Sequence, residues 1–191
     1  MPTASAPRRT LVTGANRGLG LEFVRQLLAR GDHVVATSRH PGRAHALNQL
    51  VGQHPGRLHV LPLDAADPKT HAELAREIPL VVDGLDLLIN NAGVLHSGER
   101  FGQVPPAQLD DSLRTNASGP FLLTQTLAAH LVDGATVANV SSVLGSIAST
   151  SGFHTPSYAI SKAAQNMATV LLAQGLAERG IALLALHPGW V

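Results

Sequence analysis

The sequence predicts an α/β protein, a doubly wound parallel sheet of six strands with helices on both faces. Short apolar runs alternate with longer segments of helical periodicity along the chain, which is the pattern of repeated strand–helix–strand units. The runs are nearly continuous, as in parallel strands that are buried on both faces. A glycine-rich turn also joins the first strand to the first helix. The ligand cleft of such a fold lies at the carboxyl ends of its strands.

The composition is that of a single domain spanning residues 1–191. Hydrophobic residues make up 45% of the chain, enough for a substantial core. The net charge of +1 gives no reason to expect nucleic-acid or membrane binding. Cysteine is absent and the ten histidines are scattered, so no disulfide and no metal site is expected. Residues 1–8 are expected to form a disordered polar leader without the apolar core of a signal peptide, which favours a cytoplasmic protein.

The expected strands lie at residues 10–13, 33–38, 58–63, 85–90, 136–141 and 181–186. The expected helices lie at residues 19–30, 42–53, 67–82, 105–132 and 157–179. Pro79 is expected to kink the third helix or end it early, because proline cannot donate a helical hydrogen bond. In the fourth helix, Asn116, Gly119 and Pro120 predict a local kink or bulge.

The first strand runs into the sequence G-A-N-R-G-L-G at residues 14–20. Glycines let the backbone turn tightly and approach a ligand closely. The helix that follows would offer free N–H groups and its positive dipole end to a phosphate. The spacing G-x-x-x-G-x-G differs from the commoner G-x-G-x-x-G. Its place between a strand and a helix predicts a pyrophosphate site, with a plain tight turn as the alternative.

The second strand ends in Thr37, Ser38 and Arg39. An acidic residue at this place marks NAD binding in folds of this type, and none is present. Arg39 and Arg17 could both reach a ribose 2′-phosphate, which a guanidinium binds through planar, bidentate donors. Two solvated arginines are the alternative. The sequence therefore favours NADP(H) over NAD(H).

Polar side chains follow three further strands. Asp64 is expected either to cap the next helix or to bind the edge of an adenine. The sequence N-N-A-G at residues 90–93 could pin neighbouring loops through its amides and let a cofactor lie close, although a plain turn would also explain it. Ser141 and Ser142 end the fifth strand, and because adjacent strand residues point to opposite faces, one of them should face the site.

Tyr158 and Lys162 are four residues apart, so on a helix both side chains emerge on one face. An ammonium held beside a phenol favours the phenolate and lowers a pKa that starts near ~10. A tyrosine tuned in this way can act as a general acid or base. A surface tyrosine beside a solvated lysine is the alternative for an isolated Y-x-x-x-K.

Taken together, these motifs resemble the short-chain dehydrogenase/reductase family. The family's motifs occur in its order over nearly the whole chain: T-G-A-N-R-G-L-G at 13–20, N-N-A-G at 90–93, Asn116, Ser142, Y-x-x-x-K at 158–162 and P-G at 188–189. The run S-S-V-L-G-S-I-A, the long loop before Tyr158 and the ending A-L-H-P-G-W-V are similar to the branch that contains Sniffer-type carbonyl reductases and C-factor-like proteins. The resemblance implies a Rossmann-like fold.

The resemblance also implies a catalytic role for four residues. Tyr158 would protonate a carbonyl oxygen or deprotonate an alcohol while hydride passes to or from a nicotinamide. Ser142 would hydrogen-bond the substrate oxygen, with Ser141 as the alternative serine. Lys162 would bind the nicotinamide ribose and lower the pKa of Tyr158. Asn116 would hold a water that links Lys162 to solvent.

The implied cofactor contacts come from all along the chain. Three glycines shape the pyrophosphate turn, Asp64 meets the adenine, the N-N-A-G turn lines the adenosine ribose, and Pro188 and Gly189 approach the nicotinamide. The full set is Gly14, Asn16, Arg17, Gly18, Leu19, Gly20, Arg39, Asp64, Ala65, Asn91, Ala92, Gly93, Tyr158, Lys162, Pro188 and Gly189.

Members of the family continue past the P-G motif with segments that cover the substrate, whereas this sequence ends at Val191. The sixth strand is therefore expected to be an exposed apolar edge. The expected function is NADP(H)-dependent oxidoreduction of a carbonyl or alcohol substrate. The alternative is a catalytically weak or inactive nucleotide-binding or signalling protein. The family further implies a homodimer or homotetramer formed through the helices at 105–132 and 157–179.

Overall fold

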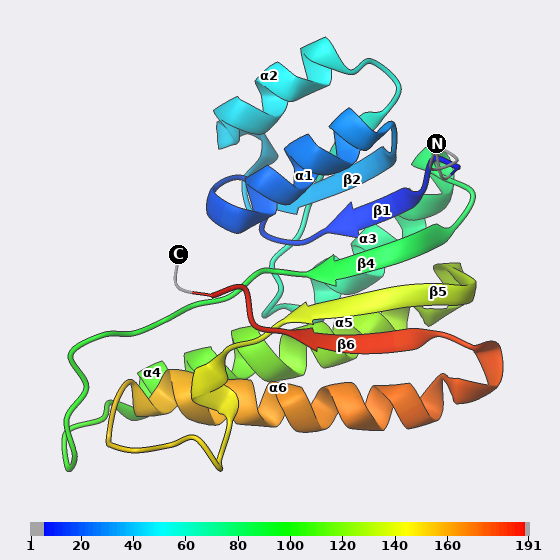
Figure 1. Ribbon diagram of the computed structural model, residues 1–191. Coiled ribbons are helices and arrows are strands. Elements are labelled where there is room, and N and C mark those ends of the chain that lie inside the picture. Colours follow the sequence, from blue (N-terminus) through cyan, green and yellow to red (C-terminus); the bar gives the residue numbers. More distant parts are fainter. Residues whose placement is uncertain (1–5, 190–191) are drawn as a thin grey trace.

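The computed structural model describes residues 6–189 and contains the predicted fold, a six-stranded parallel sheet with helices on both faces (Figure 1). The strand order is β3-β2-β1-β4-β5-β6. The strands are β1 (Arg9–Val12), β2 (His33–Ser38), β3 (Leu58–Pro62), β4 (Leu85–Asn90), β5 (Leu131–Val140) and β6 (Ala182–Leu186). The α-helices are α1 (Gly18–Arg30), α2 (His45–Gln53), α3 (Pro68–Val81), α4 (Pro106–Leu113), α5 (Gly119–Leu127) and α6 (Pro156–Gly175).

Two apolar layers sandwich the sheet. Helices α1 and α2 cover one face, and α3, α5 and α6 cover the other (Figure 1). Successive residues of a strand serve opposite layers: Leu11 joins the core on the α3 and α5 side, while Val12 joins the core beneath α1. Because both faces of the central strands are covered, these strands carry the continuous apolar runs from which the fold class was predicted.

The long helix expected at 105–132 is interrupted, as its glycine and proline predict. Helix α4 ends at Leu113, a π-helical turn spans Arg114–Ser118, and α5 begins at Gly119. Pro120 then stands in the first turn of α5, where a missing N–H costs little. Asn116 lies inside the π-helical turn, and such turns often occur at functional sites.

Four boundaries differ clearly from the prediction. The helices expected to end at residues 132 and 179 end at Leu127 and Gly175, and a 3₁₀ turn follows each of them. Strand β5 begins at Leu131 instead of residue 136, with an irregularity in its pairing to β4 that takes up the extra residues. Gly134 lies in this stretch with φ of 76°. The helix expected from residue 42 is a 3₁₀ turn at Pro41–Arg43 followed by α2 from His45, because Ala44 between them has a non-helical ψ of 61°.

Two further expectations concern strand β6 and the N-terminal residues. Strand β6 pairs only with β5 among the described strands, and its Leu184 and Leu186 are 44% and 40% exposed, which agrees with the predicted apolar edge. At the other end, residues 1–5 of the expected leader lie outside the described residues. The Arg8 N–H donates to Asp32 Oδ1 at 3.0 Å, and its carbonyl accepts from the His33 N–H at 2.9 Å. The backbone of Arg8 is therefore hydrogen-bonded beside the start of β2.

No helix within residues 6–189 is both long enough and apolar enough to cross a membrane.

Candidate active site

Because all six strands are parallel, their carboxyl ends meet at one edge of the sheet, as the arrowheads of β1, β4, β5 and β6 show (Figure 1). The glycine turn follows β1, and Arg39 follows β2. The N-N-A-G turn follows β4, the two serines follow β5, and Pro188 and Gly189 come shortly after β6. The fold thus brings the predicted site segments together at the carboxyl ends of the strands.

The glycine turn has no room for side chains at two of its positions. Gly14 has φ of 62°, and a Cβ there would lie 2.9 Å from the Cα of Ala92. A Cβ on Gly20 would lie 2.4 Å from the Gly14 carbonyl oxygen and 2.5 Å from Asn91 Nδ2. These distances are too short for any β-carbon, so the close approach of the turn to the N-N-A-G segment requires glycine.

The start of α1 fits an anion such as a pyrophosphate. The helix begins at Gly18, and Arg17 precedes it as an extended N-cap residue without a side-chain cap. The first N–H groups of the helix therefore have no capping side chain, and together with the positive end of the helix dipole they form the kind of cradle that binds phosphate. A nicotinamide dinucleotide is a group that this turn fits.

The N-N-A-G segment is more than a plain turn. Asn91 Nδ2 donates to the Thr13 carbonyl at 2.9 Å and to the Gly14 carbonyl at 3.2 Å. In return, Thr13 Oγ1 accepts from the N–H groups of Asn91 at 3.0 Å and Ala92 at 2.9 Å. These four hydrogen bonds fasten the turn after β4 to the turn after β1. The expectation that the amides pin neighbouring loops agrees with this arrangement for Asn91.

Arg17 and Arg39 lie on neighbouring segments. The Ala15 N–H donates to the Thr37 carbonyl at 2.9 Å, which holds the glycine turn against the end of β2. Both arginines are exposed, and within residues 6–189 neither side chain makes a hydrogen bond or an ion pair. Two guanidinium groups are thus available on the side of the site where β2 ends.

Asp64 does not cap the next helix, so that expectation is wrong. The cap of α3 is Asp67, whose Oδ1 accepts from the Lys69 N–H at 3.0 Å. Asp64 Oδ1 instead accepts from the Ala66 N–H at 3.0 Å and closes a tight turn after β3. The capping position lies directly before Pro68, which begins the helix.

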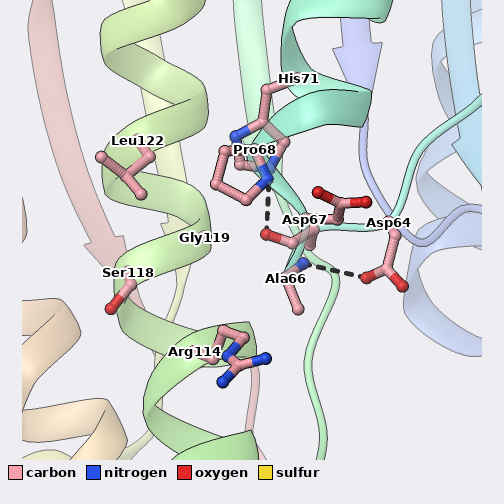
Figure 2. Close-up of a pocket in the computed structure, with 10 residues that line it drawn as sticks. Asp64, Ala66, Asp67, Pro68, His71, Arg114, Ser118, Gly119 and Leu122 are labelled. Atoms are coloured by element: carbon pink, nitrogen blue, oxygen red, sulfur yellow. Dashed lines mark hydrogen bonds between the residues drawn. The ribbon is translucent and has the colours of Figure 1, made fainter.

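A hollow of about 490 Å³ opens beside Asp64 and Ala65. Figure 2 shows Asp64 and Asp67 on the connection from β3 to α3, with Arg114 of the π-helical turn across from them. His71, on α3, is buried and its Nε2 donates to the Ala65 carbonyl at 3.0 Å. Burial lowers the pKa of His71, which favours a neutral ring at pH 7.

Asn116 is completely buried, and its side chain ties the π-helical turn to two other segments. Its Oδ1 accepts from the Val94 N–H at 2.8 Å, and its Nδ2 donates to the Val94 carbonyl at 2.8 Å. Nδ2 also donates to the Ser161 hydroxyl on α6 at 2.9 Å. Asn116 therefore fixes the loop after β4 against the helix that carries Tyr158 and Lys162.

The two serines after β5 face different neighbours, as the alternation of strand residues predicts. The Ser141 hydroxyl is buried and donates to Asn166 Oδ1 at 2.6 Å, which fastens β5 to α6. Ser142 Oγ accepts from the Leu144 N–H at 3.2 Å, and the Ser142 side chain lies close enough to Tyr158 to lower the pKa of its phenol. Ser142 is thus the serine that lies next to the tyrosine.

Tyr158 and Lys162 share one face of α6, and Lys162 Nζ lies 5.5 Å from the centroid of the tyrosine ring. Lys162 is only 4% exposed. Its ammonium donates to the Val140 carbonyl at 2.7 Å and to Gln165 Oε1 at 2.9 Å. The alternative of a solvated surface lysine does not hold.

The expected tuning of Tyr158 is wrong for this structure. Burial raises the pKa of Tyr158, and the hydrogen bond with Ser142 opposes that rise only in part. The ammonium of Lys162 donates its hydrogen bonds to Val140 and Gln165. Burial also lowers the pKa of Lys162, to about 8. The phenol is accordingly protonated at neutral pH.

Three contacting residues were missed in the sequence: Thr13, Ser161 and Gln165. Thr13 is the last residue before the glycine turn, and no spacing rule distinguishes it. The sequence contains a weak signal for Ser161 and Gln165. They lie three and seven residues after Tyr158, so on a helix both fall on the face that carries Tyr158 and Lys162. A polar residue on the same helix face as Tyr158 and Lys162 is a candidate contact of the site, and this rule would have identified Gln165.

The comparisons with known proteins agree with this geometry. The chain matches the short chain dehydrogenase family over residues 8–191. It is 31% identical over 183 residues to the uncharacterized oxidoreductase C663.08c of Schizosaccharomyces pombe, which covers 94% of this chain and 72% of that protein. The chain therefore belongs to the short-chain dehydrogenase/reductase family.

Within this family, the solved structures indicate a branch. The NADPH-bound carbonyl reductase from chicken fatty liver superposes with a TM-score of 0.90 at 36% identity, covering 96% of this chain and 76% of that one. The carbonyl reductase Sniffer of D. melanogaster superposes with a TM-score of 0.91 at 32% identity, covering 96% of this chain and 81% of that one. The chain resembles the Sniffer-type carbonyl reductase branch, as its motifs predicted.

Proposed function

We propose that the protein is an NADP(H)-dependent oxidoreductase that transfers hydride between the cofactor and a carbonyl or alcohol substrate. The observation that carries this proposal is the arrangement at the end of β5. Tyr158 lies beside the Ser142 hydroxyl, with Lys162 Nζ 5.5 Å from its ring centroid, at the same sheet edge as the glycine turn. Membership of a family with oxidoreductases and the likeness to an NADPH-bound carbonyl reductase support it.

The cofactor would be held by the segments that follow β1, β2, β3, β4 and β6. The uncapped start of α1 would bind the pyrophosphate, Asp64 and Ala65 the adenine, and residues 91–93 the adenosine ribose. Pro188 and Gly189 would lie along the nicotinamide. When bound, the nicotinamide supplies or accepts the hydride. Arg17 and Arg39 would pair with a 2′-phosphate, which is the reason for proposing NADP(H) over NAD(H).

The chain's own residues would handle the proton. A phenol that is protonated at neutral pH is ready to donate to a carbonyl oxygen, so the raised pKa of Tyr158 suits reduction. Ser142 would donate its hydroxyl hydrogen to the same oxygen and stabilise the charge that develops there. Alcohol oxidation requires the phenolate, and we expect it to be favoured at alkaline pH. Lys162 would bind the ribose, and Asn116 would hold the loop after β4 in place.

The first experiment is a fluorescence titration of the purified 191-residue protein with NADPH and with NADH. Binding that prefers NADPH, followed by NADPH oxidation with members of a carbonyl panel, supports the proposal. Tyr158→Phe should keep cofactor binding and lose turnover by about 10²-fold or more, the usual contribution of a general acid. Ser141→Ala is the matched control, because Ser141 bonds Asn166 and not Tyr158. A folded protein that oxidises no NADPH with any carbonyl would contradict the proposal.

A second candidate is a nucleotide-binding or signalling protein with little catalysis. One observation favours it: the ammonium of Lys162 donates to Val140 and Gln165, and burial raises the pKa of Tyr158 instead of lowering it. Such a protein would bind NADPH with the same residues and show no difference in cellular role between the wild type and Tyr158→Phe. An oxidoreductase would lose its role with that substitution.

A further inference from the structure

Lys162 is held by two neutral acceptors deep in the structure. The carbonyl of Val140 accepts one N–H of its ammonium at 2.7 Å, and Gln165 Oε1 accepts another at 2.9 Å. An ammonium has three N–H donors, so one is left for a ligand. A Cβ built on Gly93 would lie 3.9 Å from Nζ, so the ammonium borders the N-N-A-G turn.

Within residues 6–189, no charged side chain pairs with this ammonium. Burial is the cause that lowers the pKa of Lys162 to about 8, with no carboxylate acting on it. Four segments surround Lys162. They contribute Tyr158 from α6, the Val140 carbonyl from β5, Gly145 from a 3₁₀ turn at Val143–Gly145, and Gly93 from the N-N-A-G turn. Tyr158 is the titratable group among them. The protonated lysine therefore depends on hydrogen bonds to neutral oxygens.

Packing alone does not account for a glutamine at position 165. Gln165 is 1% exposed, and within residues 6–189 its Nε2 is buried without a hydrogen-bond partner. A leucine of similar size would fill the same space and leave no donor unpaired. The contact that distinguishes glutamine from leucine here is the hydrogen bond from Lys162.

We propose that Gln165 is a positioning residue for Lys162: its side-chain oxygen, together with the Val140 carbonyl, fixes the ammonium beside the N-N-A-G turn with one N–H free for a ligand. The functional consequence rests on the proposed oxidoreductase, in which Lys162 binds the cofactor ribose. The contact itself exists in the protein with or without turnover, so it can be tested separately.

The sequence offers a clean probe, because Lys69 and Lys162 are its two lysines. Protein labelled with ¹³C at lysine Cε gives two NMR signals whose shifts report the titration of each ammonium. Lys69 is exposed and serves as an internal reference. The comparison is between the wild type, Gln165→Leu and Gln165→Glu, each as the full chain without cofactor.

The two substitutions should move the titration in opposite directions. Gln165→Leu removes an acceptor from the charged form and should lower the pKa of Lys162 by about one unit, a tenfold change in its protonation equilibrium. Gln165→Glu adds a negative charge and should raise it by about one unit or more. Gln174→Leu and Gln174→Glu, at an exposed position of the same helix, should leave both lysines unmoved.

Opposite shifts confined to Lys162 support the proposal, and a merely structural role would not change sign with the charge at position 165. Unmoved titration, or equal shifts from both substitutions, overturns it. If Gln165→Glu does not fold, Gln165→Leu and Gln165→Met decide, since both should lower the pKa of Lys162.

An activity measurement separates this proposal from the proposed function. In an active enzyme, the alkaline limb of the kcat/KM profile should shift in the same direction as the pKa of Lys162, with kcat/KM measured at saturating NADPH. A chain without any turnover contradicts the oxidoreductase, while the NMR titration still decides the role of Gln165.

Discussion

Asn116, on the π-helical turn, donates a hydrogen bond of 2.9 Å to the hydroxyl of Ser161, on the helix that carries Tyr158 and Lys162. The same side chain makes two hydrogen bonds of 2.8 Å with the backbone of Val94. One carboxamide thus joins the turn between α4 and α5, helix α6 and the loop after β4. Three segments that are far apart in the sequence are held in register at the site.

Asn116→Ala should destabilise the protein by about 3 kcal/mol, because it removes three hydrogen bonds, two of them to the partly buried backbone of Val94. Ser161→Ala removes one hydrogen bond from this group and should cost about 1 kcal/mol. Urea unfolding measures both. Asn48→Ala is the control, since Asn48 makes an exposed hydrogen bond to the Pro41 carbonyl and its loss should stay within about 0.5 kcal/mol. Equal effects of Asn116→Ala and Asn48→Ala would contradict this role.

The fold was predictable because its signals are local and repeated. Alternating apolar runs and helical segments predict the six strands, and glycine with proline predicts the break near Asn116. The start of β5 was missed for a physical reason. Asp133 and Gly134 are typical turn residues, whereas the pairing of Leu131 with Leu85 on β4 is a tertiary contact that no local pattern reports.

The site was predictable as a set of residues but not in its contacts. The positions of the motifs at strand ends followed from the topology, whereas the direction of a long side chain depends on acceptors contributed by other segments. Lys162 could be placed on the face of Tyr158 from spacing alone. Its hydrogen bonds to Val140 and Gln165 depend on the packing of α6 against β5.

An ion pair between neighbouring strands gives a pH prediction. Arg9 on β1 binds Asp86 on β4 through Nε and Nη2, each at 2.8 Å, and this hydrogen bonding lowers the pKa of Asp86. A depressed folded-state pKa stabilises the protein above the unfolded pKa, near ~3.9, and this contribution is lost as the pH falls through the folded value.

Asp86→Asn should therefore lower the free energy of unfolding by about 1 kcal/mol at pH 7. The difference in the free energy of unfolding between Asp86→Asn and the wild type should shrink below about pH 4, where the wild-type carboxylate becomes protonated. Urea unfolding curves of both proteins, recorded from pH 7 down to below pH 4, measure this difference. Asp133→Asn is the control, because Asp133 pairs with Arg179 but is 79% exposed and should contribute less. A difference that is independent of pH would mean that charge has no part in the effect.

Arg39→Ala should weaken NADPH binding by about tenfold or more, since a charge-assisted contact with a phosphate is among the stronger hydrogen bonds. NADH binding should change little, because NADH has no 2′-phosphate. Parallel fluorescence titrations with both cofactors measure the ratio. Arg43→Ala, which removes an exposed arginine of the nearby 3₁₀ turn, is the matched control. Equal losses for both cofactors would exclude the assignment of Arg39 to the 2′-phosphate.

Gly20→Ala should disrupt the glycine turn, because the added Cβ would overlap the Gly14 carbonyl oxygen at 2.4 Å. We expect a loss of about 2 kcal/mol or more in stability, as for other forced overlaps in a packed region, together with weaker cofactor binding. Gly52→Ala provides the contrast. Its Cβ would meet nothing within 4 Å in helix α2, so it should stabilise the protein by about 0.5–1 kcal/mol. Thermal unfolding of the two variants should therefore shift in opposite directions.

The outer face of α6 predicts self-association. Ile160, Met167 and Leu171 are 49%, 61% and 51% exposed, and their i, i+7, i+11 spacing places them on one side of the helix. Exposed apolar residues gathered in this way mark interaction surfaces. We expect the wild type to be a dimer or tetramer in multi-angle light scattering, as the family resemblance implies.

The double substitution Met167→Glu and Leu171→Glu should convert that oligomer to a monomer, because two charges would have to be buried in the interface at a cost of several kcal/mol. The helix itself should persist, since both side chains face outward and glutamate is a good helix former. Leu80→Glu tests specificity: Leu80 is 76% exposed on α3, away from α6, and its substitution should leave the mass unchanged. A wild type that is already monomeric at tens of micromolar would show that this apolar face does not mediate self-association.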